Sequence, residues 1–249
     1  MKTVMITGCS SGFGLELARF LLEQDWSVVA TMRRPDESVL PRSERLRVLP
    51  LDVTDRGSIA AAVAAAGPVD ALINNAGIGW LSALEGTPEA MVRTIFETNT
   101  FGTIEMVRAV LPQMRARGSG LVVNVSSSVT LKALPLLSIY TASKMAVNGF
   151  TECLALELAP LGIRTHLVLP GQAPGTAFSS NARAMMANAG DVPAAYAAFT
   201  EATIAALMQN AAQEPTTPDD VVRAIWRVLT DPDAPFCVPA GSDALALAA

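Results

Sequence analysis

Short apolar segments rich in β-branched residues alternate with longer helical patterns through the first two thirds of the chain. Strands are expected at 3–7, 27–31, 46–51, 69–73, 121–125 and 164–169, with a seventh at 236–239 near the end. Between them, apolar residues recur at helical spacing, as over 13–24, 88–116 and 138–158. This alternation predicts an α/β fold with a doubly wound, parallel, seven-stranded sheet that carries helices on both faces.

The composition is that of a folded protein with a large core. Of the 249 residues, 51% are hydrophobic and 16% are charged, and no linker or internal repeat divides them, so we expect a single domain over 1–249. A net charge of −5 gives no electrostatic reason to expect nucleic acid or an anionic membrane as a partner. Because no apolar run is long enough to span a bilayer and no secretory signal precedes the first expected strand, we expect a cytoplasmic protein.

The three cysteines, Cys9, Cys153 and Cys237, fall in no metal-ligand spacing. Their number is odd, which in a reducing compartment indicates free thiols. The sequence therefore predicts neither a disulfide nor a metal site.

The segment TGCSSGFG, at 7–14, joins the first expected strand to the first helical pattern. Gly8 suits a tight turn, Gly12 lets the backbone approach a pyrophosphate, and Gly14 allows close helix packing. The helix N-terminus adds free amides and the positive end of a dipole. Plain turn chemistry is the alternative, but the strand–loop–helix context favours a dinucleotide site formed by Gly8, Ser10, Ser11, Gly12, Phe13 and Gly14.

The end of the second expected strand bears on the choice of dinucleotide. An acidic residue about 20 positions beyond the glycines binds the ribose 2′-hydroxyl of NAD, but this chain has Met32, Arg33 and Arg34 there. A guanidinium suits a 2′-phosphate, so Arg33 and Arg34 favour NADP over NAD. The alternative is that both arginines belong to an ordinary solvated turn.

Two further polar segments follow expected strands. Asp52 and Val53, in LDVT, are placed to flank an adenine, and NNAG at 74–77 follows the fourth strand. Asn75, Ala76 and Gly77 are either turn residues or part of the path of a dinucleotide along the carboxyl edge of the sheet.

Tyr140 and Lys144 lie four residues apart in a helical pattern, so their side chains are expected on one face. A phenol titrates near pH 10 and is a reluctant acid at neutral pH. A neighbouring ammonium favours the phenolate and is expected to bring its pKa toward the range of general acid–base catalysis. The alternative is an ordinary contact at the protein surface.

A serine cluster, VSSSV, comes off the fifth expected strand. Ser127, thirteen positions before Tyr140, is placed to donate a hydrogen bond to a substrate carbonyl oxygen. Ser126 and Ser128 are alternatives that the spacing alone does not exclude.

Six ordered motifs together resemble the short-chain dehydrogenase/reductase family, in its compact single-domain branch: TGCSSGFG, NNAG, Asn99, the serine run, YTASK and the PG pair at 170–171. The resemblance runs in register from residue 3 to about 171 and implies a Rossmann-type domain. The stretch VVATMRRP is similar to the branch that includes 17β-hydroxysteroid and retinol dehydrogenases.

The resemblance also implies roles for individual residues. Tyr140 would donate or accept the proton, Ser127 would orient the carbonyl or alcohol, and Lys144 would bind the nicotinamide ribose and lower the pKa of Tyr140. Asn99 would hold a water in a proton relay, and Arg33 with Ser11 would mark a preference for NADP.

The chain departs from the family pattern after Pro170 and Gly171, which the resemblance places at the cofactor. The threonine usual five positions after the proline is Gly175 here, and Thr176 follows, so either the loop carries one extra residue or the carboxamide contact is lost. The chain end lacks the glycine-rich segment of many tetrameric members. A homodimer through 88–116 and 138–160 is therefore expected by resemblance.

Segment 172–217 lacks the strand–helix rhythm and is expected to form a helical flap over the carboxyl edge of the sheet. Apolar side chains expected to wall a substrate are Trp80, 131–137, Phe178, Met185, Met186, Tyr196 and Phe199. Such walls favour a hydrophobic ketone or alcohol over a sugar or phosphate ester. The alternative is that these residues only pack the flap.

The sequence thus predicts an NADP-dependent oxidoreductase that transfers a hydride between nicotinamide and a hydrophobic ketone or secondary alcohol, in the reductive direction. One rival is an epimerase or dehydratase of the extended relatives, which have a longer C-terminal substrate domain. Another is a non-catalytic, NADP-sensing regulator, which is expected to have lost Tyr140 or Lys144.

Overall fold

The computed structural model describes residues 1–187, 192–211 and 215–248. Within them, one seven-stranded parallel sheet has the order β3-β2-β1-β4-β5-β6-β7. Its strands are β1 (Thr3–Thr7), β2 (Ser27–Met32), β3 (Leu46–Pro50), β4 (Ala71–Asn74), β5 (Gly120–Val125), β6 (Ile163–Pro170) and β7 (Cys237–Ala240). The predicted doubly wound parallel sheet is confirmed, and strand ends differ from the prediction by one or two residues.

The strand order reverses between β1 and β4. The chain runs outward through β1, β2 and β3, then returns to the other side of β1 for β4 and continues outward to β7. In open α/β sheets, ligands bind at the carboxyl ends of the strands beside this reversal. The loops that follow Thr7 and Asn74 therefore meet at the edge where a dinucleotide is expected.

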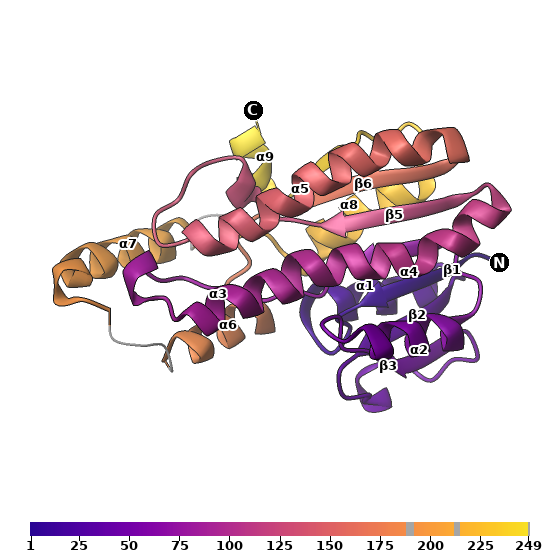
Figure 1. Ribbon diagram of the computed structural model, residues 1–249, viewed down its shortest axis with the longest axis horizontal. Helices are drawn as coiled ribbons and strands as arrows, with labels where there is room; N and C mark the ends of the chain where they lie inside the picture. Colours follow the sequence, from indigo (N-terminus) through magenta and orange to yellow (C-terminus); the bar gives the residue numbers. More distant parts are fainter. Residues whose placement is uncertain (188–191, 212–214, 249) are drawn as a thin grey trace.

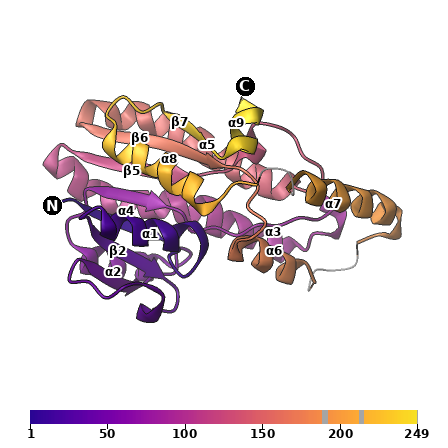
Figure 2. The same cartoon turned by 180° about the vertical axis from the view of Figure 1, so that it is seen from behind.

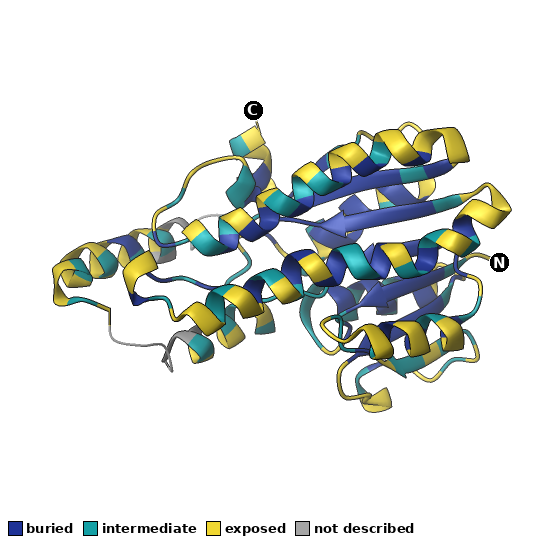
Figure 3. Cartoon of the chain, viewed as in Figure 1, coloured by how far each residue is buried: buried dark blue, intermediate teal, exposed yellow. Residues whose placement is uncertain are grey.

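Helices cover both faces of the sheet (Figures 1 and 2). On one face, α1 (Gly12–Glu23) packs beside α8 (Pro218–Thr230), and their apolar residues share a core with alternate residues of the strands. On the other face lie α2 (Arg56–Ala66), α4 (Gly102–Arg117) and α5 (Ser138–Leu158), with a second core. Figure 3 shows that the central strands are buried almost throughout, as near-continuous apolar strands between two helical layers should be.

The predicted helix over 88–116 is interrupted. It consists of α3 (Glu89–Phe96), a π-helical turn η3 (Glu97–Phe101) and α4. The hydroxyl of Thr103 donates to the carbonyl of Asn99 at 2.8 Å and so satisfies a backbone acceptor in the widened turn. Periodicity over such a long apolar pattern does not reveal one extra residue, which is why the sequence predicted a continuous helix.

Beyond the carboxyl edge of the sheet, 172–217 carries α6 (Ala177–Ala187), the short 3₁₀ helix η6 (Ala194–Tyr196) and α7 (Ala197–Ala211). Figure 1 shows α6 and α7, in orange, past the ends of the strands. We call 172–217 the flap. Of its predicted walls, Met186 has a side chain outside the described part.

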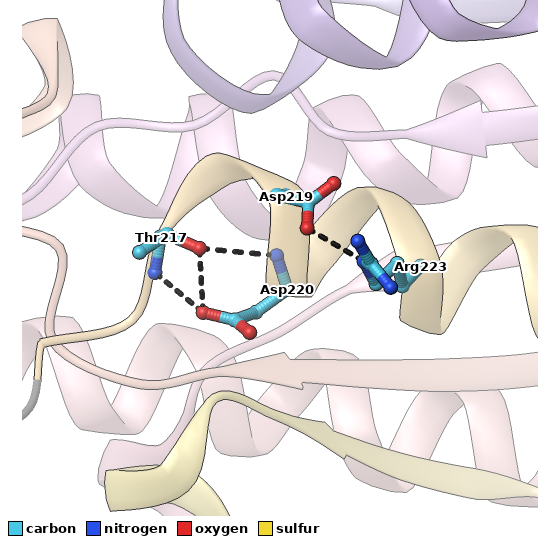
Figure 4. A network of polar contacts seen from close by, with 4 residues as sticks. All are labelled: Thr217, Asp219, Asp220 and Arg223. Carbon is cyan, nitrogen blue, oxygen red and sulfur yellow. Dashed lines mark hydrogen bonds and ion pairs between the residues drawn. The ribbon is translucent and has the colours of Figure 1, made fainter.

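The flap leads into α8 through a capping box. The hydroxyl of Thr217 accepts from the amide of Asp220 at 3.2 Å, and the carboxylate of Asp220 accepts from the amide of Thr217 at 2.8 Å (Figure 4). Pro218 occupies the first helical turn, where its missing N–H costs nothing. These residues fix the start of α8 at the end of the flap.

The remaining elements are short. They are the final helix α9 (Ser242–Ala248) and the 3₁₀ helices η1 (Glu37–Val39), η2 (Leu84–Gly86), η4 (Ser128–Thr130) and η5 (Ala159–Leu161). Within the described ranges, no helix combines the length and the apolar character that crossing a membrane requires.

Candidate active site

The glycine loop after β1 has the backbone that its sequence predicts. Gly8 and Gly12 have positive φ angles, +77° and +59°, which glycine adopts without steric cost. A Cβ on Gly14 would lie 2.4 Å from the carbonyl oxygen of Gly8, so only glycine allows α1 this close. A Cβ on Gly12 would meet only the Cβ of Thr176, at 4.0 Å, among the described atoms. The loop therefore leaves room above Gly12.

The NNAG segment supports this loop. The hydroxyl of Thr7 accepts from the amides of Asn75 and Ala76 at 3.0 and 2.9 Å. The side-chain amide of Asn75 donates to the carbonyls of Thr7 and Gly8 at 3.0 and 3.2 Å. These donors are already engaged, so Asn75 and Ala76 shape the loop. Thr7, which ties them to β1, was missed by the sequence analysis.

The start of α1 fits an anionic group. Ser11 is the N-cap, and within the described residues its side chain makes no capping hydrogen bond and the first turn carries no acidic residue. The first amides of a helix lack intrahelical partners, so Ser10, Ser11 and these amides are available to phosphate oxygens. Phe13 packs partly against the core and anchors the turn.

Arg33 and Arg34 follow β2 as exposed side chains, and neither forms an ion pair with another described residue. Hydrogen bonds from Thr54 are the main cause of the lowered pKa of Asp52, to which the charge of Arg33 contributes. Arg33 thus lies near Asp52. Val53 packs on the start of α4, where a Cβ on Gly102 would lie 2.9 Å from its Cγ2.

Tyr140 and Lys144 both lie on the buried face of α5, only 7% and 5% exposed. The Lys144 ammonium donates to the carbonyl of Val125 at 3.0 Å and makes no ion pair within the described residues. Burial lowers its pKa to about 8. An ammonium has three donors, so this one retains capacity for ligand hydroxyls.

The predicted lowering of the Tyr140 pKa by Lys144 is wrong for the protein alone. Burial raises the pKa of Tyr140 to about 12, and a hydrogen bond with Ser127 opposes that rise. Among the described residues, Lys144 is not a group that shifts it. The ammonium is held at the end of β5 by the Val125 carbonyl, while desolvation acts directly on the phenol.

The structure distinguishes Ser127 from its neighbours. Ser127 is the serine whose side chain interacts with Tyr140, and its hydroxyl also accepts from the amide of Val129 at 3.4 Å. Ser126 points elsewhere, donating to Oδ1 of Asn148 at 2.6 Å. Ser128 is buried at the start of η4. The hydroxyls of Ser127 and Tyr140 therefore lie beside each other, whereas those of Ser126 and Ser128 are placed elsewhere.

Asn99, in the π-helical turn, joins the NNAG loop to α5. Its Oδ1 accepts from the amide of Ile78 at 2.8 Å, and its Nδ2 donates to Oγ of Ser143 at 3.1 Å. Ser143 in turn donates to the carbonyl of Tyr140 at 2.7 Å. A Cβ on Gly77 would lie 3.2 Å from Oδ1 of Asn99 and 3.5 Å from Nζ of Lys144, so these groups converge.

The flap approaches the glycine loop through Thr176 and approaches Tyr140 through Phe178. Thr176 stands opposite Gly12, whereas a Cβ on Gly175 would meet no described atom within 4 Å. The Phe178 ring lies 5.9 Å from the Tyr140 ring between centroids. At the other end of this loop, the amide of Gly171, after Pro170, donates to the carbonyl of Ala240 at 3.1 Å.

Comparison with known proteins identifies the family. The family model for short chain dehydrogenases matches residues 2–187. The chain belongs to the short-chain dehydrogenase family. The membership expected from the six motifs is confirmed.

Relatives of this short-chain dehydrogenase include human retinol dehydrogenase 8, which is 36% identical over 94% of this chain and 80% of its own length. A short-chain dehydrogenase from Streptomyces avermitilis superposes with a TM-score of 0.85 at 34% identity, over 99% of this chain and 90% of its own. A short-chain dehydrogenase from Burkholderia cenocepacia in complex with NADP superposes with a TM-score of 0.78 at 28% identity, over 100% of this chain and 93% of its own.

The residues expected to wall a substrate lie in different surroundings in this short-chain dehydrogenase. Phe178 contacts Tyr140 and sits on Gly79, where a Cβ would lie 2.8 Å from its ring. Trp80, by contrast, is 2% exposed and donates to the hydroxyl of Thr87 at 3.0 Å, so it packs inside the protein. Phe199 is 52% exposed on α7.

Sequence reasoning missed the residues that hold the site together. Thr7, Ser143 and Asn148 each bond to a predicted site segment from inside a strand or helix. Each is a small polar residue within an apolar segment, and that pattern could have indicated a buried hydrogen bond. The partner of such a residue cannot be read from the sequence, because it depends on how the helices and strands pack together.

Proposed function

We propose that this short-chain dehydrogenase reduces a hydrophobic ketone to a secondary alcohol with NADPH. One observation supports the proposal most strongly: the buried Tyr140 hydroxyl lies beside the Ser127 hydroxyl. The buried Lys144 amine lies on the same helix as Tyr140. When bound, the nicotinamide cofactor supplies the hydride.

Tyr140 acts as the proton donor and Ser127 orients the carbonyl. With a pKa raised to about 12 by burial, the Tyr140 phenol is protonated at neutral pH. A proton donor must start protonated, but a pKa this far above neutral also weakens the phenol as an acid, so interactions that favour the phenolate have to lower it during the reaction. The Ser127 hydroxyl, held beside it, is placed to donate to the same carbonyl oxygen as negative charge develops there.

Lys144 holds the nicotinamide ribose and supplies positive charge to the site. Its ammonium is almost fully buried and donates to the Val125 carbonyl. Its remaining donors favour hydroxyl ligands at this position. Asn99 is proposed to hold a water for a proton relay; because both hydrogens of its side-chain amide already donate to Ile78 and Ser143, that water would have to donate to an oxygen of Asn99.

NADP is proposed over NAD because β2 is followed by Arg33 and Arg34, while Asp36 caps η1 farther along. A 2′-phosphate forms charge-assisted bonds to guanidinium groups. A relative has been crystallised with NADP. The glycine loop, Ser10, Ser11, Asp52, Val53 and Thr176 complete the proposed site.

The substrate is proposed to be apolar because the flap presents Phe178 to Tyr140. A relative named for an apolar alcohol, human retinol dehydrogenase 8, supports this class. A cytoplasmic homodimer is also proposed. Met145, Leu156 and Phe101, on α5 and the turn before α4, are 55%, 79% and 51% exposed, and a subunit contact would cover them.

The test is to follow NADPH absorbance with a panel of apolar ketones of graded size. We expect consumption with at least one ketone and a slower reaction with NADH. Binding of NADPH without consumption across a broad panel would favour the regulator instead.

A further inference from the structure

The carboxylate of Asp243, in the first turn of α9, binds the two ends of the flap at once. Its Oδ2 accepts from the amide of Gln172 at 2.6 Å. Its Oδ1 accepts from the hydroxyl of Thr216, also at 2.6 Å. Gln172 opens the flap and Thr216 lies at its close, so one side chain from the end of the chain joins both.

The surrounding backbone is built to admit this carboxylate. A Cβ on Gly171 would lie 2.0 Å from Oδ1 of Asp243, and a Cβ on Gly241 would lie 2.0 Å from Oγ1 of Thr216. Gly241 also has a φ of +98°. The amide of Thr216 donates to the carbonyl of Gln172 at 2.9 Å, which closes the base of the flap.

From Gln172 the contacts continue into the flap. Its side-chain amide donates to the carbonyl of Leu207 in α7 at 3.2 Å. Four residues later Thr176 stands opposite Gly12, and Phe178 follows against Tyr140. Gln172 thus connects Asp243 to α7 through its side chain and to α6 through the chain that follows it.

We propose that Asp243 is a positioning residue that holds the flap beside the glycine loop and Tyr140 and so determines substrate affinity. The proposal rests on the proposed function for its kinetic consequences, although the contacts themselves do not. Hydrogen bonds to a carboxylate are roughly twice as strong as neutral ones. Both flap ends lose a partner when this group is removed.

The test compares Asp243→Ala, Asp243→Asn and Asp219→Ala. Asp219 pairs with Arg223 at 2.6 Å on α8, outside the capping box (Figure 4), and so controls for the loss of an exposed carboxylate. The readouts are kcat and KM for the best ketone, NADPH affinity, and hydrogen–deuterium exchange of α6 and α7.

We expect Asp243→Ala to raise KM for the ketone about tenfold, because a lost bond to a charged group costs enough for that factor. The value of kcat should stay within about threefold, and exchange in α6 and α7 should accelerate while the sheet is unchanged. Asp243→Asn keeps one acceptor oxygen and should fall between. Unchanged KM and exchange in Asp243→Ala would overturn the proposal.

If Asp243→Ala does not fold, Thr216→Val removes the bond from Thr216 to Asp243, together with the 3.1 Å contact of the same hydroxyl with the carbonyl of Ala240, and should raise both the exchange of the flap and KM. If no ketone is reduced, the proposed function fails, but the exchange of α6 and α7 still decides the role of Asp243. Faster exchange of the whole protein would indicate a merely structural role.

Discussion

Ser126 donates its hydroxyl to Oδ1 of Asn148 at 2.6 Å, across the contact between β5 and α5. Its neighbour Ser127 interacts instead with Tyr140. The two adjacent serines thus have different partners. Ser126 ties the end of β5 to Asn148 of α5, whereas Ser127 lies beside the Tyr140 hydroxyl.

This difference predicts different phenotypes. Ser127→Ala should lower kcat/KM about 100-fold, because one donor to a developing oxyanion is lost, and it should also lower the free energy of unfolding by about 1 kcal/mol, because the hydroxyl caps η4 through the amide of Val129. Ser126→Ala should lower the free energy of unfolding by about 1 kcal/mol and change turnover only slightly. Urea denaturation and steady-state kinetics check both, and a slower reaction in Ser126→Ala than in Ser127→Ala would contradict the assignment.

Tyr140→Phe should lower kcat at least about 100-fold, because a general acid contributes this much or more. NADPH affinity should be nearly unchanged. The chain has only one other tyrosine, Tyr196, which bonds to Glu85, so Tyr196→Phe is the matched control and should keep wild-type turnover. Substantial activity in Tyr140→Phe would refute its role as the proton donor.

Lys144→Met should stabilise the protein without nucleotide at pH 7. Burial lowers the pKa of Lys144 from 10.5 to about 8, so the folded protein binds fewer protons than the unfolded chain between these values. Burying the charged Lys144 therefore lowers the free energy of unfolding by about 3 kcal/mol below about pH 8. This loss of stability disappears as the pH rises through 10.5. In the variant the Val125 carbonyl loses its hydrogen-bond partner, and this loss offsets about 1 kcal/mol of the gain in stability.

The measurement is urea denaturation at pH 7 and pH 10. We expect Lys144→Met to be about 2 kcal/mol more stable than wild type at pH 7 and nearly equal at pH 10. Lys132→Met, at an exposed lysine, should show no such dependence on pH. A lower stability of Lys144→Met at pH 7 would contradict the buried charge.

Arg33→Ala should raise KM for NADPH by about 10- to 100-fold, because charge-assisted bonds to a phosphate are lost. KM for NADH should change little, since NADH lacks the 2′-phosphate. Arg42→Ala removes another exposed arginine between β2 and β3 and serves as the control. Equal effects of Arg33→Ala on both nucleotides would count against NADP recognition by this side chain.

Gly79→Ala should move the Phe178 ring away from Tyr140. The added Cβ would lie 2.8 Å from that ring, and the ring is the end of a movable side chain, so stability should change little. KM for the ketone should rise by several-fold while NADPH affinity is kept. Phe178→Ala should reproduce this effect, and wild-type KM values in both would exclude Phe178 from the substrate wall.

Sequence reasoning was strongest for the fold and for the residues at strand ends. The parallel sheet follows from alternating apolar segments, and the carboxyl edge then gathers the glycine loop, NNAG and the serine cluster. Family membership followed from motif order. The homodimer, the cytoplasmic location and the preference for NADP stay predictions.

Sequence reasoning failed where the outcome depends on competing local energies. Spacing placed Lys144 on the same face as Tyr140, but the pKa of Tyr140 depends on desolvation, which only packing reveals. Trp80 looked like a substrate wall, yet its indole N–H bonds to Thr87 inside the protein. The contact of Asp243 with both flap ends joins positions too far apart in the chain for any local pattern.

The position of the Asn99 side chain depends on the number of residues in the π-helical turn between α3 and α4, and not only on which residues these are. Each residue removed from an α-helix rotates the half before the deletion by about 100° relative to the half after it. A π-helical turn holds one residue more than an α-helical turn, so the turn at Glu97–Phe101 absorbs that extra residue without such a rotation, and Ile95 before it and Met106 after it are both fully buried. Deleting one residue there would leave both halves in the core but turn the π-helical turn into an ordinary one, which would carry the side-chain amide of Asn99 away from Ile78 and Ser143.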